Sequence, residues 1–381
     1  MHALCEQCAV APLLRELIFA SEQFGKCSLC GVDSTRVLPT REAVFIRAVK
    51  ALIRYHYSEW DYHGKLGGDS FEQLLSRANP IFVFREASDD CKYEDFILSV
   101  LDSLDSDHNI TLFTAYGRDI YNYLAMPAVS LGEHSILSTL KQELDIKNYF
   151  EVEVAFESTF QPLQKSVSGT IHQSEQFFRA RIGAPAKAAN FHYIEPRSVF
   201  YQPYTGQAIG APPVGNAHAG RLNRPGVSFL YLASDMDTAI AEIRPHPGEF
   251  VSVGSFTASR DISIADFSKH DLGRLFADDQ ELDLLRLIIS VENAFAAMAP
   301  PSNRQVYSLT QFLAEVFRRM GFEGIRFRST VGPGINLVIF DPTLVAWNAD
   351  SARAVKVESV TYKHSPCLLY DSNAIYNVDY D

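Results

Sequence analysis

The chain has 381 residues, of which 47% are hydrophobic and 12% aromatic, so it can bury large cores and is expected to fold into two or three globular domains rather than remain disordered. Its net charge of −12 opposes the counterion release that drives non-specific nucleic-acid binding. The N-terminus lacks a signal-peptide pattern, and no apolar run is long enough to span a bilayer. We therefore expect a soluble, cytoplasmic protein without a membrane partner.

Two cysteine pairs stand near the N-terminus, Cys5 with Cys8 and Cys27 with Cys30, and eighteen residues separate the pairs. Two CxxC turns at this spacing are typical of a zinc ribbon, because each turn places two thiolates on one side of the ion. Four ligands leave no open position, so the predicted zinc is structural. The alternative is four unrelated reduced thiols in a reducing compartment. Residues 12–19, between the pairs, have helical spacing, and the module is predicted to cover residues 1–39.

The following stretch, residues 40–150, is predicted to be mainly α-helical. Apolar residues recur at three- and four-residue steps over 40–57, with Thr40 as the expected N-cap. Further helices are expected at 69–78, 92–104 and 134–147. No glycine-rich nucleotide loop and no metal-ligand pair occurs in this stretch.

Near residue 150 the pattern changes, because residues 151–156 (EVEVAF) alternate, as strands do. A third domain with both strands and helices is therefore predicted over residues 151–381. Its expected strands and helices, in chain order, are strands at 177–182, 229–233 and 250–256, helices at 280–298 and 306–320, and strands at 324–327, 335–340 and 354–362. Asp235 is expected to cap a short helix directly after the second of these strands.

Arg221, Tyr231 and Glu242 are spaced ten and eleven residues apart around the predicted strand at 229–233. Together with Arg179 and Ser329 they suit a dinucleotide site. Guanidinium groups bind pyrophosphate bidentately, an aromatic ring can stack on nicotinamide, and a carboxylate stabilises an oxocarbenium-like transition state. From spacing alone, a structural ion pair beside a core tyrosine is the more economical interpretation.

Five separated motifs change that balance: GRLN at 220–223, VSFLYLA at 227–233, TAIAEIRPH at 238–246, YSLTQFLAE at 307–315 and GFEGIRFRS at 321–329. Together they resemble the RES domain family over about residues 174–350. The family is named for its Arg, Glu and Ser, which here correspond to Arg221, Glu242 and Ser329.

The resemblance implies an α+β fold similar to ADP-ribosyltransferases and a toxin-like activity that cleaves NAD+ at the nicotinamide–ribose bond, by water or phosphate. The implied catalytic residues are Arg221, Tyr231, Glu242 and Ser329. Arg179, Arg221 and Asn223 would hold the dinucleotide, Tyr231 would pack on the nicotinamide end, and Asn336 would assist Ser329 at a phosphate or ribose hydroxyl.

The N-terminal cysteines and helices resemble the zinc-ribbon and HEPN-like extension of longer RES proteins, although the Arg-x4-His signature of HEPN ribonucleases is absent. RES toxins typically pair with an Xre-type antitoxin. This chain is much longer than a minimal RES toxin, so the Xre-type partnership is not the only expectation. A different inhibitor and a role as a phage-defence effector are the alternatives, and a homodimer also stays open. The competing functions are ADP-ribosyl transfer to a macromolecule and a non-catalytic zinc-containing regulatory module.

Overall fold

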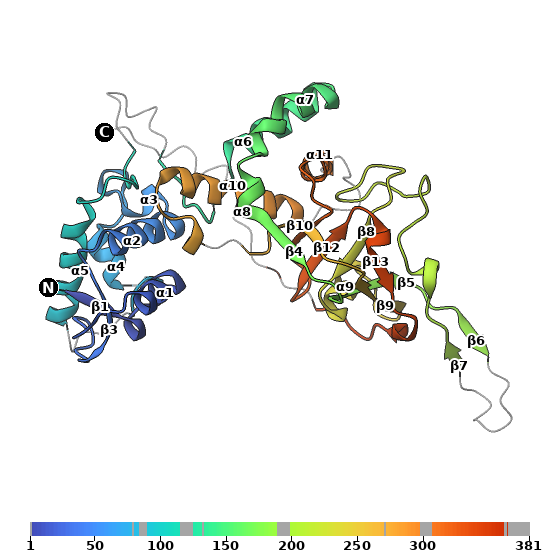
Figure 1. Ribbon diagram of the computed structural model, residues 1–381, viewed down its shortest axis with the longest axis horizontal. Coiled ribbons are helices and arrows are strands. Elements are labelled where there is room, and N and C mark those ends of the chain that lie inside the picture. Colours follow the sequence, from blue (N-terminus) through green and yellow to red (C-terminus); the bar gives the residue numbers. More distant parts are fainter. Residues whose placement is uncertain are drawn as a thin grey trace, which may run out of the picture.

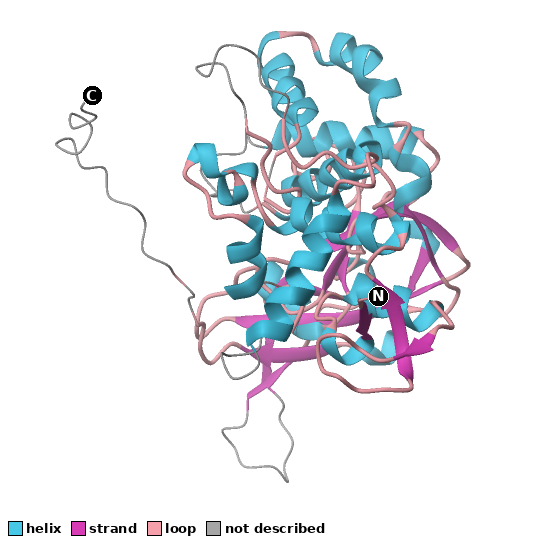
Figure 2. Cartoon of the chain, turned by 90° about the vertical axis from the view of Figure 1, so that its left-hand side faces the viewer, coloured by secondary structure: helices cyan, strands magenta, loops and turns pink. Residues whose placement is uncertain are grey.

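The computed structural model describes residues 2–77, 80–83, 90–114, 125–131, 133–188, 199–269, 272–297, 307–361 and 364. The molecule is elongated, with the N-terminal region (residues 2–131) at one end and a mixed β-sheet at the other (Figure 1). Helices and strands are largely segregated, as the α+β class requires (Figure 2). Among the described residues, no helix combines the length and the apolar character that a membrane span needs.

A small three-stranded antiparallel sheet forms the N-terminus, with the strand order β1-β3-β2. Its elements are β1 (Ala3–Cys5), α1 (Pro12–Ala20), β2 (Phe24–Gly25) and β3 (Thr35–Pro39). The predicted helix at 12–19 is thus confirmed, and it begins at Pro12, whose missing N–H costs nothing in a first turn. Leu14 and Ile18 of α1 belong to one buried cluster with Phe45, Val49 and Phe96 of the following helices, so the sheet packs directly on those helices.

The helical part of the N-terminal region comprises α2 (Ala43–His56), α3 (Glu59–Tyr62), α4 (Phe71–Arg77) and α5 (Asp90–Leu104). Helices α2, α4 and α5 agree with the predicted helices, except that Thr40 is not the N-cap, whereas α3 was not predicted. The Thr40 side chain is buried and lies 3.3 Å from the carbonyl oxygen of His2, to which its hydroxyl donates. A turn therefore separates β3 from α2, and Glu42 occupies the cap position.

Three further helices, α6 (Ser135–Ile146), α7 (Tyr149–Phe156) and α8 (Leu163–Val167), lead into the C-terminal sheet. The alternating run at 151–156 is part of α7 rather than a strand. Within it, Val152 is buried and the Glu153 carboxylate forms a 2.7 Å ion pair with Arg319. Alternation was misleading because Glu153 lies on the packed side of the helix, where Arg319 compensates its charge.

Nine strands form the C-terminal sheet in the order β13-β9-β5-β8-β12-β11-β10-β4, with β14 also paired to β9. Of the recorded pairings in this sheet, β10 with β11 is parallel and the rest are antiparallel. The strands are β4 (Ser168–Ile171), β5 (Gln176–Ile182), β8 (Leu230–Ala233), β9 (Phe250–Ala258), β10 (Ile262–Asp266), β11 (Gly324–Arg328), β12 (Ile335–Ile339), β13 (Val345–Trp347) and β14 (Arg353–Lys356). A separate hairpin, β6 (Ala186–Ala188) with β7 (Val199–Tyr201), extends from the end of the molecule (Figure 1).

Three helices accompany the sheet: α9 (Met236–Glu242), α10 (Asp279–Ala296) and α11 (Tyr307–Arg319). The C-terminal half of α10 and the apolar face of α11 bury Phe295, Phe312 and Phe317 against the sheet. The N-terminal half of α10 instead packs on Ala51 of α2 through Leu282 and other residues. A single helix thus belongs to both cores, and it lies between the two ends of the molecule (Figure 1).

Candidate active site

A cavity of about 340 Å³ opens where β5 and β8 diverge. Among the described residues these two neighbouring strands pair at a single register position, Phe178 opposite Ala233. The cavity is lined by residues of β5, β8, β11 and β12, of α9 and its C-terminal end, of the start of α11 and of the loop before β8, namely Phe178, Arg179, Ala180, Arg221, Tyr231, Leu232, Ala233, Ala239, Glu242, Ile243, Tyr307, Phe327, Asn336 and Val338. Five of the predicted site residues therefore share one cavity: Arg179, Arg221, Tyr231, Glu242 and Asn336.

Helix α9 carries Glu242 into this cavity. The helix begins after Asp235, whose carboxylate accepts a 2.8 Å hydrogen bond from the backbone N–H of Thr238, so the predicted cap is confirmed. Glu242 is the last residue of the helix, two turns from that cap. Because β8 ends only three residues before α9 begins, Tyr231 and Glu242 are both held at the same opening of the sheet.

The Glu242 carboxylate is held through one of its oxygens. Oε1 accepts hydrogen bonds from the hydroxyl of Ser329 at 2.7 Å and from the side-chain amide of Asn336 at 2.6 Å. Oε2 lies 4.0 Å from the guanidinium of Arg221. With 22% of its side chain exposed, Glu242 has one oxygen fixed by neutral donors and the other near a cation at the cavity wall.

Ser329 lies behind Glu242 rather than in the cavity wall. Its hydroxyl oxygen accepts from the backbone N–H groups of Val331 and Gly332, at 3.2 and 2.9 Å, while its proton is donated to Glu242. The turn packs tightly on α9, since a Cβ at Gly332 would lie 2.7 Å from the Cα of Thr238. The resemblance implied a phosphate or ribose contact for Ser329, but in this geometry its hydroxyl orients the carboxylate.

Two arginines supply positive charge to the cavity. Arg221 donates to the carbonyl oxygen of Phe295 at 2.9 Å, and its side chain is 15% exposed. Arg179 donates to the carbonyl oxygen of Tyr231 at 2.9 Å, whereas its buried Nε has no hydrogen-bond partner among the described residues. Burial, with a smaller contribution from Arg181, lowers the pKa of Arg179 to about 10. A partly buried guanidinium whose Nε is shielded from water and has unused hydrogen-bonding capacity favours an anionic ligand.

Tyr231 presents its ring to the cavity while its hydroxyl is bound elsewhere. The hydroxyl donates to the Asn223 side-chain oxygen at 2.7 Å and accepts from the backbone N–H of Leu222 at 3.1 Å. Burial raises the pKa of Tyr231 to about 12, although these contacts and nearby arginines act in the opposite direction. The phenol is thus neutral at physiological pH, and its ring provides an apolar surface.

Asn223, a predicted dinucleotide ligand, is not among the residues that line the cavity. Its amide nitrogen donates to three carbonyl oxygens of its own loop, those of His218, Arg224 and Val227. Its oxygen accepts from Tyr231. The structure therefore places Asn223 behind the cavity, where it fixes the loop that carries Arg221.

Tyr307 and the apolar wall formed by Phe178, Phe327 and Val338 complete the cavity, and sequence reasoning gave them no role. Tyr307 begins the YSLTQFLAE motif, so that motif was the available signal. A second cavity of about 540 Å³ shares Arg179 with the first and extends along Arg181 and the loop at 210–213. Beside it, the Arg181 guanidinium lies 4.7 Å from the ring centre of Tyr204.

The four predicted metal ligands, Cys5, Cys8, Cys27 and Cys30, form one cluster whose sulfur atoms all lie within 4.8 Å of one another. Three are buried, and the Sγ atoms of Cys5 and Cys30 are 3.6 Å apart. In a tetrahedral zinc site the sulfurs are about 3.8 Å apart. Gly31 follows with a φ of +74°, which lets the chain turn back after the second pair. The residues fit a structural zinc ion.

Comparison with known proteins gives one family and one solved structure. Residues 185–362 match the model of the RES domain, so the sequence resemblance is confirmed there, although β5 with Arg179 precedes the matched range. A crystal structure of the M. tuberculosis MbcT–MbcA toxin–antitoxin complex matches with a TM-score of 0.30 and 12% sequence identity, covering 52% of this chain and 91% of that chain. No curated protein sequence matches. At this TM-score the structural match adds no weight to the family assignment.

Proposed function

Since residues 185–362 form a RES domain, we propose that the protein cleaves NAD+ at the bond between nicotinamide and ribose. The observation that carries the proposal is the environment of Glu242. One carboxylate oxygen is fixed by Ser329 and Asn336, and two arginines line the same cavity. The fixed carboxylate of Glu242 can stabilise positive charge that develops on the ribose, and the two guanidinium groups can bind the pyrophosphate of the same substrate.

In this proposal Arg179 and Arg221 bind the pyrophosphate. Two neighbouring cavities meet at Arg179, so a dinucleotide can extend from the Glu242 cavity into the one along Arg181. The ring of Tyr231 and the apolar wall then face the nicotinamide. The partial burial of Arg179 strengthens its attraction to phosphate oxygens because less water competes for its guanidinium.

The proposed reaction separates charge within the substrate. The C1′–N bond breaks, its electron pair goes to the nicotinamide nitrogen, and a cation resembling an oxocarbenium ion remains on the ribose. Glu242 stabilises this cation electrostatically. Addition of water gives ADP-ribose and a proton, and addition of phosphate gives ADP-ribose 1″-phosphate. Ser329, Asn336 and Asn223 act by orienting Glu242 and Tyr231.

The remaining assignments follow the same proposal. The four cysteines bind one structural zinc ion, which stabilises the N-terminal sheet on its helices. An activity that depletes NAD+ suits a toxin, so we propose an Xre-type antitoxin or another inhibitor as a partner.

Product analysis tests the reaction. Purified protein is incubated with NAD+ with and without phosphate, and products are identified by liquid chromatography and mass spectrometry. We expect nicotinamide together with free ADP-ribose or its phosphate. Nicotinamide release accompanied by ADP-ribosylated protein, without the free products, would instead establish ADP-ribosyl transfer. Intact NAD+ under all conditions would contradict the proposed function.

A further inference from the structure

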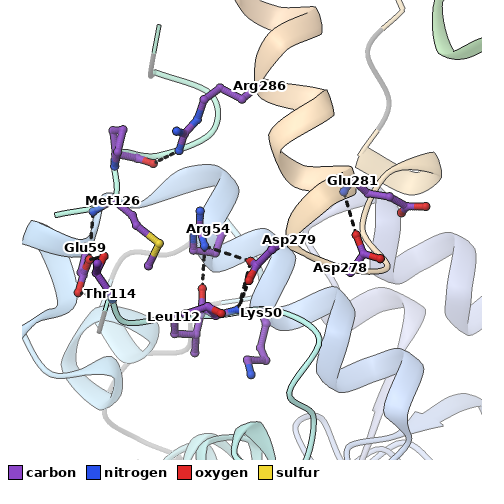
Figure 3. Close-up of polar contacts among 12 residues, drawn as sticks. Lys50, Arg54, Glu59, Leu112, Thr114, Met126, Asp278, Asp279, Glu281 and Arg286 are labelled. Atoms are coloured by element: carbon purple, nitrogen blue, oxygen red, sulfur yellow. Dashed lines mark hydrogen bonds and ion pairs between the residues drawn. The ribbon is translucent and has the colours of Figure 1, made fainter. Parts of the chain in front are cut away.

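Helix α10 connects the N-terminal region to the candidate active site. At its start, Asp279 accepts from the backbone N–H of Thr111 at 3.2 and 3.1 Å and lies 3.4 Å from the Arg54 guanidinium of α2. About two helical turns beyond Asp279, Arg286 donates to the carbonyl oxygen of Pro127 at 2.9 Å. Figure 3 shows these contacts converging on the first half of α10. The helix is therefore anchored on loops and helices outside the RES match.

The last turns of the same helix hold parts of the site. The carbonyl oxygen of Phe295 accepts from Arg221 at 2.9 Å, and that of Ala296 accepts from the Thr330 hydroxyl at 3.1 Å. With 18 residues, α10 is about 27 Å long. It therefore reaches from the contacts of Figure 3 to both Arg221 and the turn after β11.

Glu292 of α10 makes a bidentate contact with Arg328 of β11. Its carboxylate receives two hydrogen bonds from Arg328, at 2.7 and 2.9 Å, and only 4% of its side chain is exposed. Such a bidentate pair fixes both distance and orientation. Arg328 directly precedes Ser329, whose hydroxyl binds Glu242. Tyr55 of α2 interacts electrostatically with both members of the pair. Burial raises the pKa of Tyr55, and Arg328 and Glu292 shift it in opposite directions.

We propose that Glu292 is a positioning residue for NAD+ cleavage: it fixes Arg328 and thereby holds Ser329 and Glu242 in their active arrangement. This inference rests on the proposed function. It also gives the N-terminal region a role in positioning the site. The N-terminal region anchors the first half of α10, and α10 in turn places Glu292 beside Arg328.

The test compares two variants that remove one buried negative charge next to strand β11. Glu292→Gln removes the negative charge and one of the two oxygens that accept from Arg328. Asp266→Asn is the matched control, because Asp266 is 7% exposed and pairs with Arg326, two residues earlier on the same strand. Both variants are expected to lower thermal stability. Only Glu292→Gln is expected to lower kcat, by about 10- to 100-fold, with KM for NAD+ changed less than about twofold.

Hydrogen exchange of the peptide covering residues 329–334 supplies a readout that does not depend on activity. We expect faster exchange in Glu292→Gln than in the parent or in Asp266→Asn. Equal exchange in all three proteins, or equal loss of kcat in both variants, would overturn the inference. If the parent leaves NAD+ intact, the proposed function fails by itself. The exchange comparison then still decides whether Glu292 holds the turn.

Discussion

The Ser329 hydroxyl donates a 2.7 Å hydrogen bond to Oε1 of Glu242. This contact joins the turn between β11 and β12 to the last residue of α9, 87 positions earlier in the chain. Two of the three residues for which the RES family is named thus act on each other directly. The third, Arg221, lies 4.0 Å from the other carboxylate oxygen.

Removing the Ser329 hydroxyl is expected to slow catalysis more than it weakens substrate binding. In Ser329→Ala, Asn336 still holds Glu242, but the carboxylate gains rotational freedom. We expect kcat to fall about 10-fold or more, with KM for NAD+ nearly unchanged. Thr343→Ala is the control, because that hydroxyl also donates to a carboxylate, that of Asp341 at 2.8 Å, but neither residue lines the cavity. A rise in KM at constant kcat would show that Ser329 binds the substrate, as the family resemblance implied.

Replacing Arg221 by Lys tests its role as a bidentate phosphate ligand. Lysine keeps the charge but loses the planar pair of donors and the contact with Phe295. We expect KM for NAD+ to increase about 10-fold, a loss of about 1.4 kcal/mol in binding. Arg224→Lys provides the control in the same loop, since the Arg224 guanidinium lies 3.7 Å from the ring centre of Tyr149. Equal effects of the two variants would argue against substrate binding by Arg221.

Tyr231→Phe removes a hydroxyl and keeps the ring in the cavity. The side-chain oxygen of Asn223 then loses its donor in a buried position, so the free energy of unfolding should fall by about 1–3 kcal/mol. The rate of NAD+ cleavage by folded protein should change only a few-fold. A large loss of kcat without loss of stability would mean that the hydroxyl takes part in the reaction.

The same variant changes how stability depends on pH. Burial raises the pKa of Tyr231 to about 12, above its ordinary value of 10. Its stabilising contribution is therefore complete below about pH 10 and is lost as pH rises through about 12. Denaturant unfolding between pH 9 and 12 should show a smaller decline in Tyr231→Phe than in the parent. The decline should not vanish, because burial also raises the pKa of Tyr149 to about 12.

Elemental analysis of protein purified without chelators should find about one zinc ion per chain. Cys27→Ser should lower the zinc content and the melting temperature together, because the cysteine cluster shares a core with α1, α2 and α5. Cys91→Ser, at a cysteine that has no second cysteine at ligand spacing in the sequence, should change neither. Zinc-free protein with an unchanged melting temperature would contradict a structural metal.

Local patterns carried most of the fold prediction. The helices α2, α4, α5, α6, α10 and α11 have apolar spacing that sequence alone makes visible, and Asp235 marks the start of α9. Short strands such as β4 and β13 were missed, because three or four residues carry too little periodicity. The alternating pattern at 151–156 wrongly predicted a strand. The segment is helical, and its buried Glu153 is paired with Arg319 on a helix more than 150 residues away, which local sequence does not show.

The site was predictable to the extent that motifs name residues. Arg221, Tyr231 and Glu242 lie within the five motifs, Arg179 and Asn336 lie outside them, and all five residues line one cavity. Motifs do not show which partners a polar side chain binds. Ser329 and Asn223 were expected to contact the substrate, whereas in the structure Ser329 binds Glu242 and Asn223 binds Tyr231. The link from Glu292 to Arg328 had no sequence signal, since it depends on the packing of α10.

The most direct test of the account is the rate of nicotinamide release from NAD+ by the parent protein and by Glu242→Gln. Glutamine preserves size and can still accept from Ser329, but it removes the charge that stabilises the ribosyl cation. We predict a loss of about 100- to 1,000-fold in kcat. Glu249→Gln, in the turn after α9, should retain the parental rate. Parental nicotinamide release by Glu242→Gln would contradict the assignment of this cavity as an NAD+-cleaving site.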